Sequence, residues 1–228
     1  MNSKSAKNRI QGFLGEEMGE AHPIQHLKNS LADLAIFGGM IRDLTLGRPE
    51  FFHSDIDLVS SSSAEEIYSL IQNYSPIRNR FGGFRFFFLG RPYDIWSLED
   101  TWAVRQGYVE ALEIEDLCKT TFFTVDAAIY NVKNEQFYVP QFCRTSIERR
   151  VLEINLIHNP FPKKMAMKAI DLSMRKGLKI SHDLCEFVLL NGDFLDRGTG
   201  IKECLTEHLR KHQGRPFEFT RQLSLDLK

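Results

Sequence analysis

The sequence predicts an α/β protein of the α+β kind, in which helices flank a mixed sheet and a small helical region follows it. Short apolar runs that end at glycines or acids, such as 34–37 and 56–59, are typical of buried strands. Two later pairs of β-type runs are separated only by turn residues. After Pro162 the apolar residues recur at helical spacing, so we expect the last third of the chain to be helical.

The first strand is expected at Leu34–Phe37, where a glycine pair, Gly38–Gly39, ends the apolar run. Met40–Leu46 then has the pattern of a short helix. Ile56–Val59 predicts a second strand, interrupted by acids. The order strand, turn, helix, strand is therefore expected at the beginning of the sheet.

A capping box marks the next helix, because Ser63 is followed three residues later by Glu66 before an apolar run. Phe84–Leu89 and Tyr93–Leu98 are two β-type runs around Gly90, Arg91 and Pro92, and they predict an antiparallel hairpin. A further pair of strands is expected at Phe122–Val132 and Gln136–Val139. The sheet should therefore contain both parallel and antiparallel strands.

Three helical segments are expected near the carboxyl end, at Pro162–Gly177, Leu184–Leu190 and Ile201–Leu209. Neither an internal repeat nor a linker divides the 228 residues. We expect one large domain at 1–150, which includes a helical arm at its amino end, and a helical region at 151–228.

The composition excludes several classes of protein. Lys and Arg number 29 against 30 Asp and Glu, for a net charge of -1, so a surface that broadly coats nucleic acid is not expected, although a local basic groove remains compatible. Apolar runs fall far short of the roughly 18 residues of a membrane span. Four scattered cysteines without C-x-x-C spacing argue against structural zinc and favour buried thiols in a reducing compartment. We expect a soluble cytoplasmic protein that has no membrane partner.

The residues that carry chemistry gather in the stretch 36–59. A glycine pair at the start of a helix, Gly38 and Gly39, lets the backbone approach a phosphate and present N–H groups to it. Asp55 and Asp57 are two apart on a predicted strand, so they share a face with Cα atoms about 7 Å apart. The two negative charges repel each other unless a divalent ion that prefers oxygen ligands bridges the two carboxylates. The usual case is Mg²⁺ that also binds triphosphate oxygens.

A third carboxylate would complete a two-metal site, and Asp94 is the best candidate. It alternates onto the same face of its strand as Trp96 and Leu98, where an acid is out of place unless something there needs charge.

Several other residues are candidates for nucleotide contacts. Arg42 can contact phosphate or ribose, or can pair with Asp43. Arg80 and Arg85 flank Gly82–Gly83 and suit a triphosphate tail, and solvated charges at a strand edge explain them equally well. The phenylalanines between 81 and 88 are expected to alternate into the core, with room for one ring to face a nucleotide.

The stretch GGMIRDLTLGRPEFFHSDIDLV resembles the G-G-x-x-R-D…(D/E)-x-D signature of the polymerase-β-like nucleotidyltransferases, and among them the head domain of CCA-adding enzymes and bacterial poly(A) polymerases. The resemblance implies a five-stranded mixed sheet, NMP transfer from an NTP, and two Mg²⁺ ions, which Mn²⁺ can replace. The residues that match this motif are Gly38, Gly39, Arg42, Asp43, Asp55 and Asp57.

The resemblance weakens further along the chain. Phe123–Tyr130 is similar to a family strand R-D-F-T-I-N-A-L-A-Y, but Thr121 and Phe122 stand where that pattern has Arg-Asp, and Asp126 replaces its Asn. Pro162–Gly177 resembles the neck helix of the family. An E-D-x-x-R element, a body and a tail that would grip tRNA are not found, so templated C-C-A addition is not expected.

These observations together predict a Mg²⁺-dependent nucleotidyltransferase that uses an NTP, with ATP or CTP favoured, and an RNA or tRNA 3′ end as acceptor. Asp55, Asp57 and Asp94 are the expected catalytic residues and metal ligands. The expected nucleotide-binding residues are Gly38, Gly39, Arg42, Asp43, Arg80 and Arg85. Two alternatives stay open: transfer to a protein or to a small molecule such as an aminoglycoside, and a nucleotide-binding regulatory or toxin–antitoxin module with little turnover.

Overall fold

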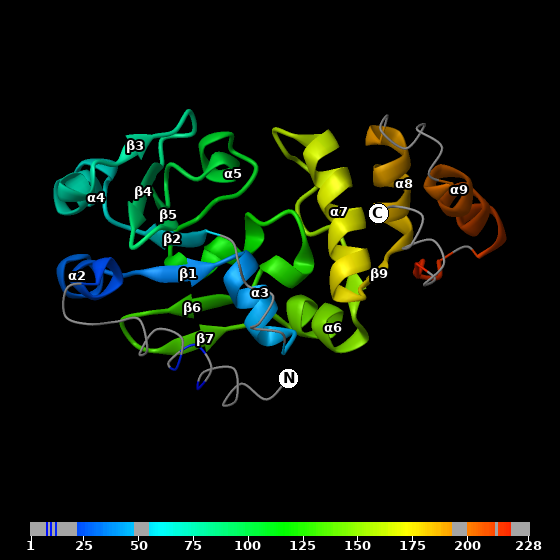
Figure 1. Ribbon diagram of the computed structural model, residues 1–228, viewed down its shortest axis with the longest axis horizontal. Coiled ribbons are helices and arrows are strands. Elements are labelled where there is room, and N and C mark those ends of the chain that lie inside the picture. The colour runs from blue at the N-terminus through cyan, green and yellow to red at the C-terminus, as the bar shows by residue number, and fades with distance from the viewer. Residues whose placement is uncertain are drawn as a thin grey trace. The chain divides into compact units, whose positions relative to one another are not determined.

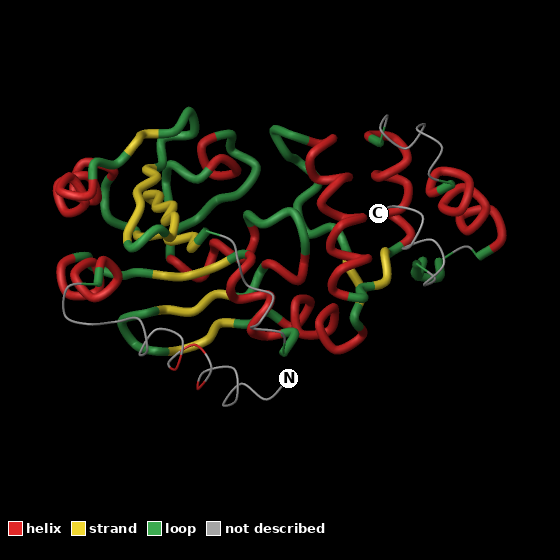
Figure 2. The backbone as a smooth tube through the Cα atoms, viewed as in Figure 1, coloured by secondary structure: helices red, strands yellow, loops and turns green. Residues whose placement is uncertain are grey.

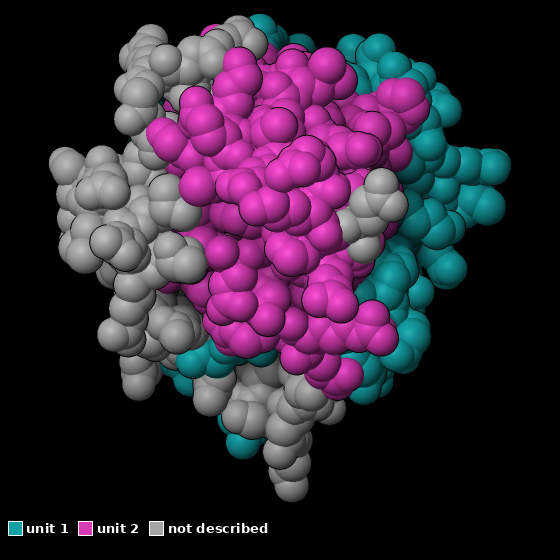
Figure 3. Space-filling model, turned by 90° about the vertical axis from the view of Figure 1, so that its right-hand side faces the viewer, with its two compact units in different colours: residues 1–121, 126–144 teal, residues 122–125, 145–228 magenta. Residues whose placement is uncertain are grey.

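The computed structural model describes residues 22–47, 55–192, 200–212 and 214–219, together with the single positions 8, 10 and 12. The expected helical arm at the amino end lies almost wholly outside the described residues. The chain divides into two compact units, unit 1 (residues 1–121 and 126–144) and unit 2 (residues 122–125 and 145–228), which Figure 3 colours separately. Among the described helices, none has both the length and the apolar character that crossing a bilayer demands.

Unit 1 is built on a mixed sheet with the strand order β3-β4-β5-β2-β1-β6-β7 (Figure 1). Strands β2 and β5 run parallel, whereas the other neighbouring pairs are antiparallel. The described part of the sheet thus has seven strands, which confirms the mixed class and corrects the five strands implied by the resemblance. The strands are β1 (Ala35–Phe37), β2 (Ile56–Ser60), β3 (Ile77–Arg78), β4 (Phe84–Phe88), β5 (Arg91–Ser97), β6 (Ile129–Asn131) and β7 (Gln136–Tyr138).

The helices of unit 1 connect these strands. They are α2 (Pro23–Ser30), α3 (Gly39–Thr45), α4 (Ala64–Ile71) and α5 (Trp102–Arg105), with 3₁₀ turns at Gln72–Tyr74 and Ile114–Lys119. A further 3₁₀ turn, Thr124–Asp126, lies where the chain passes from unit 2 back to unit 1. The capping box at α4 is confirmed, since the Glu66 backbone N–H donates to the Ser63 hydroxyl at 3.2 Å and the Ser63 N–H donates to the Glu66 carboxylate at 2.9 Å.

One face of the sheet carries the core of unit 1. Phe84, Phe86 and Tyr93 are buried there. Tyr68 of α4 packs against Phe84 with ring centroids 5.6 Å apart, and the Tyr93 hydroxyl lies 3.0 Å from Nε2 of His22, the N-cap of α2. The expected core role of alternate phenylalanines is therefore confirmed for Phe84 and Phe86, and the opposite face of β4 and β5 carries Arg85 and Asp94.

The strand expected over Phe122–Val132 is only partly correct, because β6 forms at Ile129–Asn131 alone. Residues 122–125 belong to unit 2 instead. There Phe123 forms an isolated antiparallel bridge with Ile154, and the Asn155 N–H donates to the Phe122 carbonyl at 2.8 Å. The backbone groups that would pair within the large sheet are thus used elsewhere.

Unit 2 is mainly helical, as expected, and Figure 2 shows the contrast with the strand-rich unit 1. Along the chain, the division between the units falls within helix α6 (Gln141–Arg149), after Arg144. The helices α7 (Pro162–Lys176), α8 (His182–Asn191) and α9 (Ile201–Lys211) follow. Gly177, at φ 62°, ends α7 in the left-handed conformation that favours glycine. A small parallel pair, β8 (Val151–Leu152) with β9 (Lys179–Ile180), was not expected, since two-residue strands leave no sequence pattern.

Candidate active site

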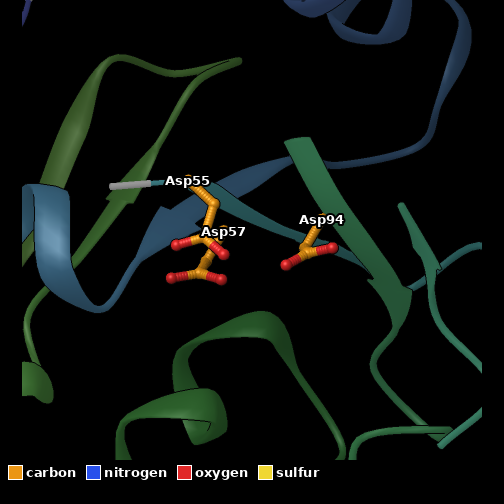
Figure 4. A group of neighbouring side chains, drawn as sticks. All are labelled: Asp55, Asp57 and Asp94. Carbon is orange, nitrogen blue, oxygen red and sulfur yellow. The ribbon is translucent and has the colours of Figure 1, made fainter. Parts of the chain in front are cut away.

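Three carboxylates converge on one face of the sheet in unit 1 (Figure 4). Asp57 of β2 and Asp94 of β5 are register partners in the parallel pair, and Asp55 lies two residues before Asp57. One oxygen from each of the three carboxylates lies within 4.8 Å of the others. The structure therefore brings together the three acids that the sequence singled out.

Alternation along the strands explains this convergence. Ile56 and Leu58 are buried on the opposite side of β2, so Asp55 and Asp57 share the remaining face. Asp94 is the most enclosed of the three, with 5% of its surface exposed. Burial raises the pKa of Asp94, against the lowering effect of its hydrogen bond to a neighbouring guanidinium.

That guanidinium belongs to Arg85 on β4, which faces Asp94 across the antiparallel β4–β5 pair. Nε of Arg85 donates to Oδ1 of Asp94 at 2.7 Å, and Nη2 donates to Oδ2 of Asp55 at 2.7 Å as well as to Oδ2 of Asp94. Hydrogen bonding to Asp94 raises the pKa of Arg85 above its already high value. A permanent cation thus lies among the acids.

The glycine pair approaches the same cluster from β1. Gly38 has φ 71° and ψ -137°, and a Cβ atom placed on it would lie only 2.9 Å from Oδ2 of Asp57. Glycine is required at this position both for the backbone conformation and for the close approach. Gly39 is the first residue of α3, so the beginning of that helix lies beside the acids.

Arg42 and Asp43 form the ion pair that the sequence analysis gave as one of two alternatives. Both are buried, and Nε of Arg42 donates to Oδ1 of Asp43 at 3.0 Å. Nη1 of Arg42 donates to Oδ1 of Asp126 at 2.8 Å. The guanidinium is thereby held by two internal carboxylates behind the glycine pair. Sequence reasoning missed this role of Asp126, although its presence in place of the family's Asn was the available signal.

The remaining candidates lie around the β4 hairpin. Arg80 is exposed on the turn before β4, with its guanidinium carbon 4.9 Å from the centroid of the Phe81 ring. Gly83 leaves space for Trp96, since a Cβ there would lie 2.1 Å from the indole nitrogen. Phe87 is 57% exposed on the side of β4 that carries Arg85, so its ring is available to a ligand of this face.

The donor set of this cluster fits a divalent cation. Carboxylate oxygens are the ligands that Mg²⁺ and Mn²⁺ prefer, and three of them come within bridging range of one another. The Arg85 guanidinium acts as a stand-in cation and shows that the cluster attracts positive charge. Asp55, Asp57 and Asp94 would be the ligands.

Comparison with known proteins finds no family model that matches the chain and no curated protein with a similar sequence. Solved structures do match. The Thermotoga maritima CCA-adding enzyme complexed with tRNA has a TM-score of 0.59 and 16% identity, over 95% of this chain and 52% of that one. A CCA-adding enzyme with CTP has a TM-score of 0.57 and 18% identity, over 95% of this chain and 53% of that one.

A third match is a tRNA nucleotidyltransferase complexed with a primer tRNA and an incoming ATP analog, with a TM-score of 0.53 and 15% identity, over 86% of this chain and 55% of that one. The chain therefore shares the fold of these solved structures. It spans about half the length of the nucleotidyltransferases that it matches. At this level of identity the likeness establishes a shared fold alone, and the site residues must carry any statement about activity.

Proposed function

We propose that this protein is a Mg²⁺-dependent nucleotidyltransferase that moves NMP from ATP or CTP to the hydroxyl at an RNA 3′ end. The observation that carries the proposal is the convergence of Asp55, Asp57 and Asp94 on one sheet face within the nucleotidyltransferase fold. The similar structures hold tRNA, CTP and an ATP analog, which supports an NTP and an RNA as the two substrates.

The chain's own residues would share the work as follows. Asp55, Asp57 and Asp94 would hold the divalent ion beside the glycine turn. The bound ion supplies charge neutralisation for the phosphates and lowers the pKa of the acceptor hydroxyl. The acceptor oxygen forms a bond to the α-phosphorus while the bond to pyrophosphate breaks, and the hydroxyl proton passes to solvent.

The nucleotide would be held mainly by the backbone of Gly38 and Gly39. Gly38 approaches Asp57 so closely that no space is left for a side chain. Arg85 and Arg80 supply cations for the triphosphate. Arg42 and Asp43 act indirectly in this proposal, because their buried ion pairs fix α3 and therefore the glycine turn. They are positioning residues.

Incubation with each α-labelled NTP, Mg²⁺ and total RNA or cell lysate tests the proposal. We expect label in RNA, its loss with a chelator, and a fall of several orders of magnitude for Asp57→Ala. Asp171→Asn, which removes a surface carboxylate paired with Arg175 in unit 2, is the matched control and should retain activity. Label in protein or in small molecules, or NTP binding without transfer, would contradict an RNA acceptor.

A further inference from the structure

Arg85 occupies three of the carboxylate oxygens that could ligate a divalent ion. Its guanidinium bonds Oδ1 and Oδ2 of Asp94 and Oδ2 of Asp55. Asp55 immediately precedes β2 and Asp94 lies on β5, so this one side chain bridges two of the three proposed metal ligands from separate segments. The cluster is thus already partly neutralised, with three carboxylates against one guanidinium.

A divalent ion on these carboxylates would compete with the guanidinium for the same oxygens. An arginine side chain stays charged at all relevant pH values, so it cannot relieve the conflict by losing its proton. A divalent ion bound by the same carboxylates would repel it at short range. Arg85 must therefore move, and it can, because 45% of its side chain is exposed.

We propose that Arg85 is an internal counter-ion that holds the three acids together without metal and is exchanged for the divalent ion when it binds. The exchange lowers the affinity for free metal, because every binding event must break the Arg85 ion pairs. It also releases a cation beside the site at the moment the metal enters. The inference rests on the metal site of the proposed function, and it assigns to Arg85 a role in metal loading in addition to contact with nucleotide.

Direct metal binding tests the exchange without relying on activity. Free Mn²⁺ is measured by its electron paramagnetic resonance signal during titration of the full chain. We expect Arg85→Gln to bind Mn²⁺ at least tenfold more tightly than the wild type. Arg85→Lys should lie between the two, since a single ammonium cannot reproduce the paired bonds to Asp94.

Arg78→Gln is the matched control for the general loss of one positive charge. Arg78 lies on the neighbouring strand β3, and its guanidinium is 5.5 Å from the ring of Phe84 on the opposite face of the sheet. Its replacement should change Mn²⁺ affinity less than twofold. Asp57→Ala should weaken Mn²⁺ binding in both the wild-type and the Arg85→Gln backgrounds, which locates the ion.

Thermal melting supplies a second readout. Without metal, Arg85→Gln should melt at a lower temperature than the wild type, because the acids lose their counter-ion, and Mn²⁺ should raise its melting temperature by a larger step. If a folded Arg85→Gln binds Mn²⁺ no more tightly than the wild type, the exchange is overturned and the proposed metal site still stands. If neither the wild type nor any variant binds Mn²⁺ at millimolar concentration, both the exchange and the proposed metal site are overturned.

Discussion

Asp57 and Asp94 lie directly opposite one another in the parallel register of β2 and β5. Parallel neighbours place register partners on the same face, so two buried or half-buried carboxylates are forced together at the middle of the sheet. Gly38, at the end of β1, approaches Asp57, and Arg85 on β4 donates a hydrogen bond to Asp94. The site is therefore a product of strand order, which brings four separate segments into one row.

Gly38→Ala should damage the site more than the fold. The new methyl group would lie 2.9 Å from Oδ2 of Asp57 at a residue with φ 71°. We expect Mn²⁺ binding and NMP transfer to fall by about tenfold or more, since the carboxylate must shift. Gly90→Ala is the matched control. It has a similar φ of 79° with nothing within 4 Å of the added Cβ, so it should cost stability, roughly 1 kcal/mol, without loss of metal affinity. Equal effects of the two variants on binding would contradict this role of Gly38.

Arg42→Met should destabilise unit 1 strongly. It removes the cation shared by the buried carboxylates of Asp43 and Asp126, and breaking such a pair typically costs about 3–5 kcal/mol. The free energy of unfolding from urea titration measures the loss. Adding Asp126→Asn removes one of the two unpaired buried charges, so the double variant should recover part of the lost free energy of unfolding. A loss below about 1 kcal/mol for Arg42→Met would show that the ion pairs are not needed.

Alkaline pH should weaken the fold through two cysteines. Burial raises the pKa of the Cys143 and Cys185 thiols to about 12, from 9.0 in an unfolded chain. Because the folded value is the higher one, the thiols stabilise the fold fully below pH 9, and this contribution is lost as the pH rises from 9 towards 12. Urea titrations on both sides of pH 9 should show the decline, and a Cys143→Ala, Cys185→Ala variant should show a shallower one. If the free energy of unfolding of the double variant falls with pH as steeply as that of the wild type, the two thiols are not the cause.

Phe87→Ala should weaken use of an RNA acceptor. The ring is 57% exposed beside Arg85, and stacking of a base on an aromatic ring is worth about 1–3 kcal/mol. We expect the KM for a short RNA to rise while the KM for the NTP stays the same, and Phe87→Tyr to retain the wild-type values. A parallel rise in both constants would mean that the ring supports the fold or the nucleotide instead.

Local patterns explain which features the sequence could predict. The capping box at Ser63, the glycine turn at Gly38 and the two-residue spacing of Asp55 and Asp57 each depend on a few adjacent residues. Asp94 could be found because an acid interrupts an otherwise apolar strand face. In each case the signal and the structure lie within the same short segment.

Pairings between distant segments could not be predicted in the same way. The hairpin turns at Leu89 and Gly90, both with positive φ, so the turn begins one residue and ends two residues before the Gly90–Pro92 turn that the sequence favoured. That shift sets Arg85 opposite Asp94. Arg42 and Asp126 are 84 positions apart, and their ion pair appears only once the fold is formed.

Transfer to an RNA with a defined end tests the central claim most directly. A short RNA that ends in a 3′-hydroxyl is incubated with α-labelled ATP or CTP and Mg²⁺, beside the same RNA with a 3′-deoxy end. The three-acid site predicts label on the 3′-hydroxyl RNA alone, and its absence for Asp57→Ala and Asp94→Asn. The account is contradicted if the 3′-hydroxyl RNA stays unlabelled with every NTP, or if both acid variants label it as the wild type does.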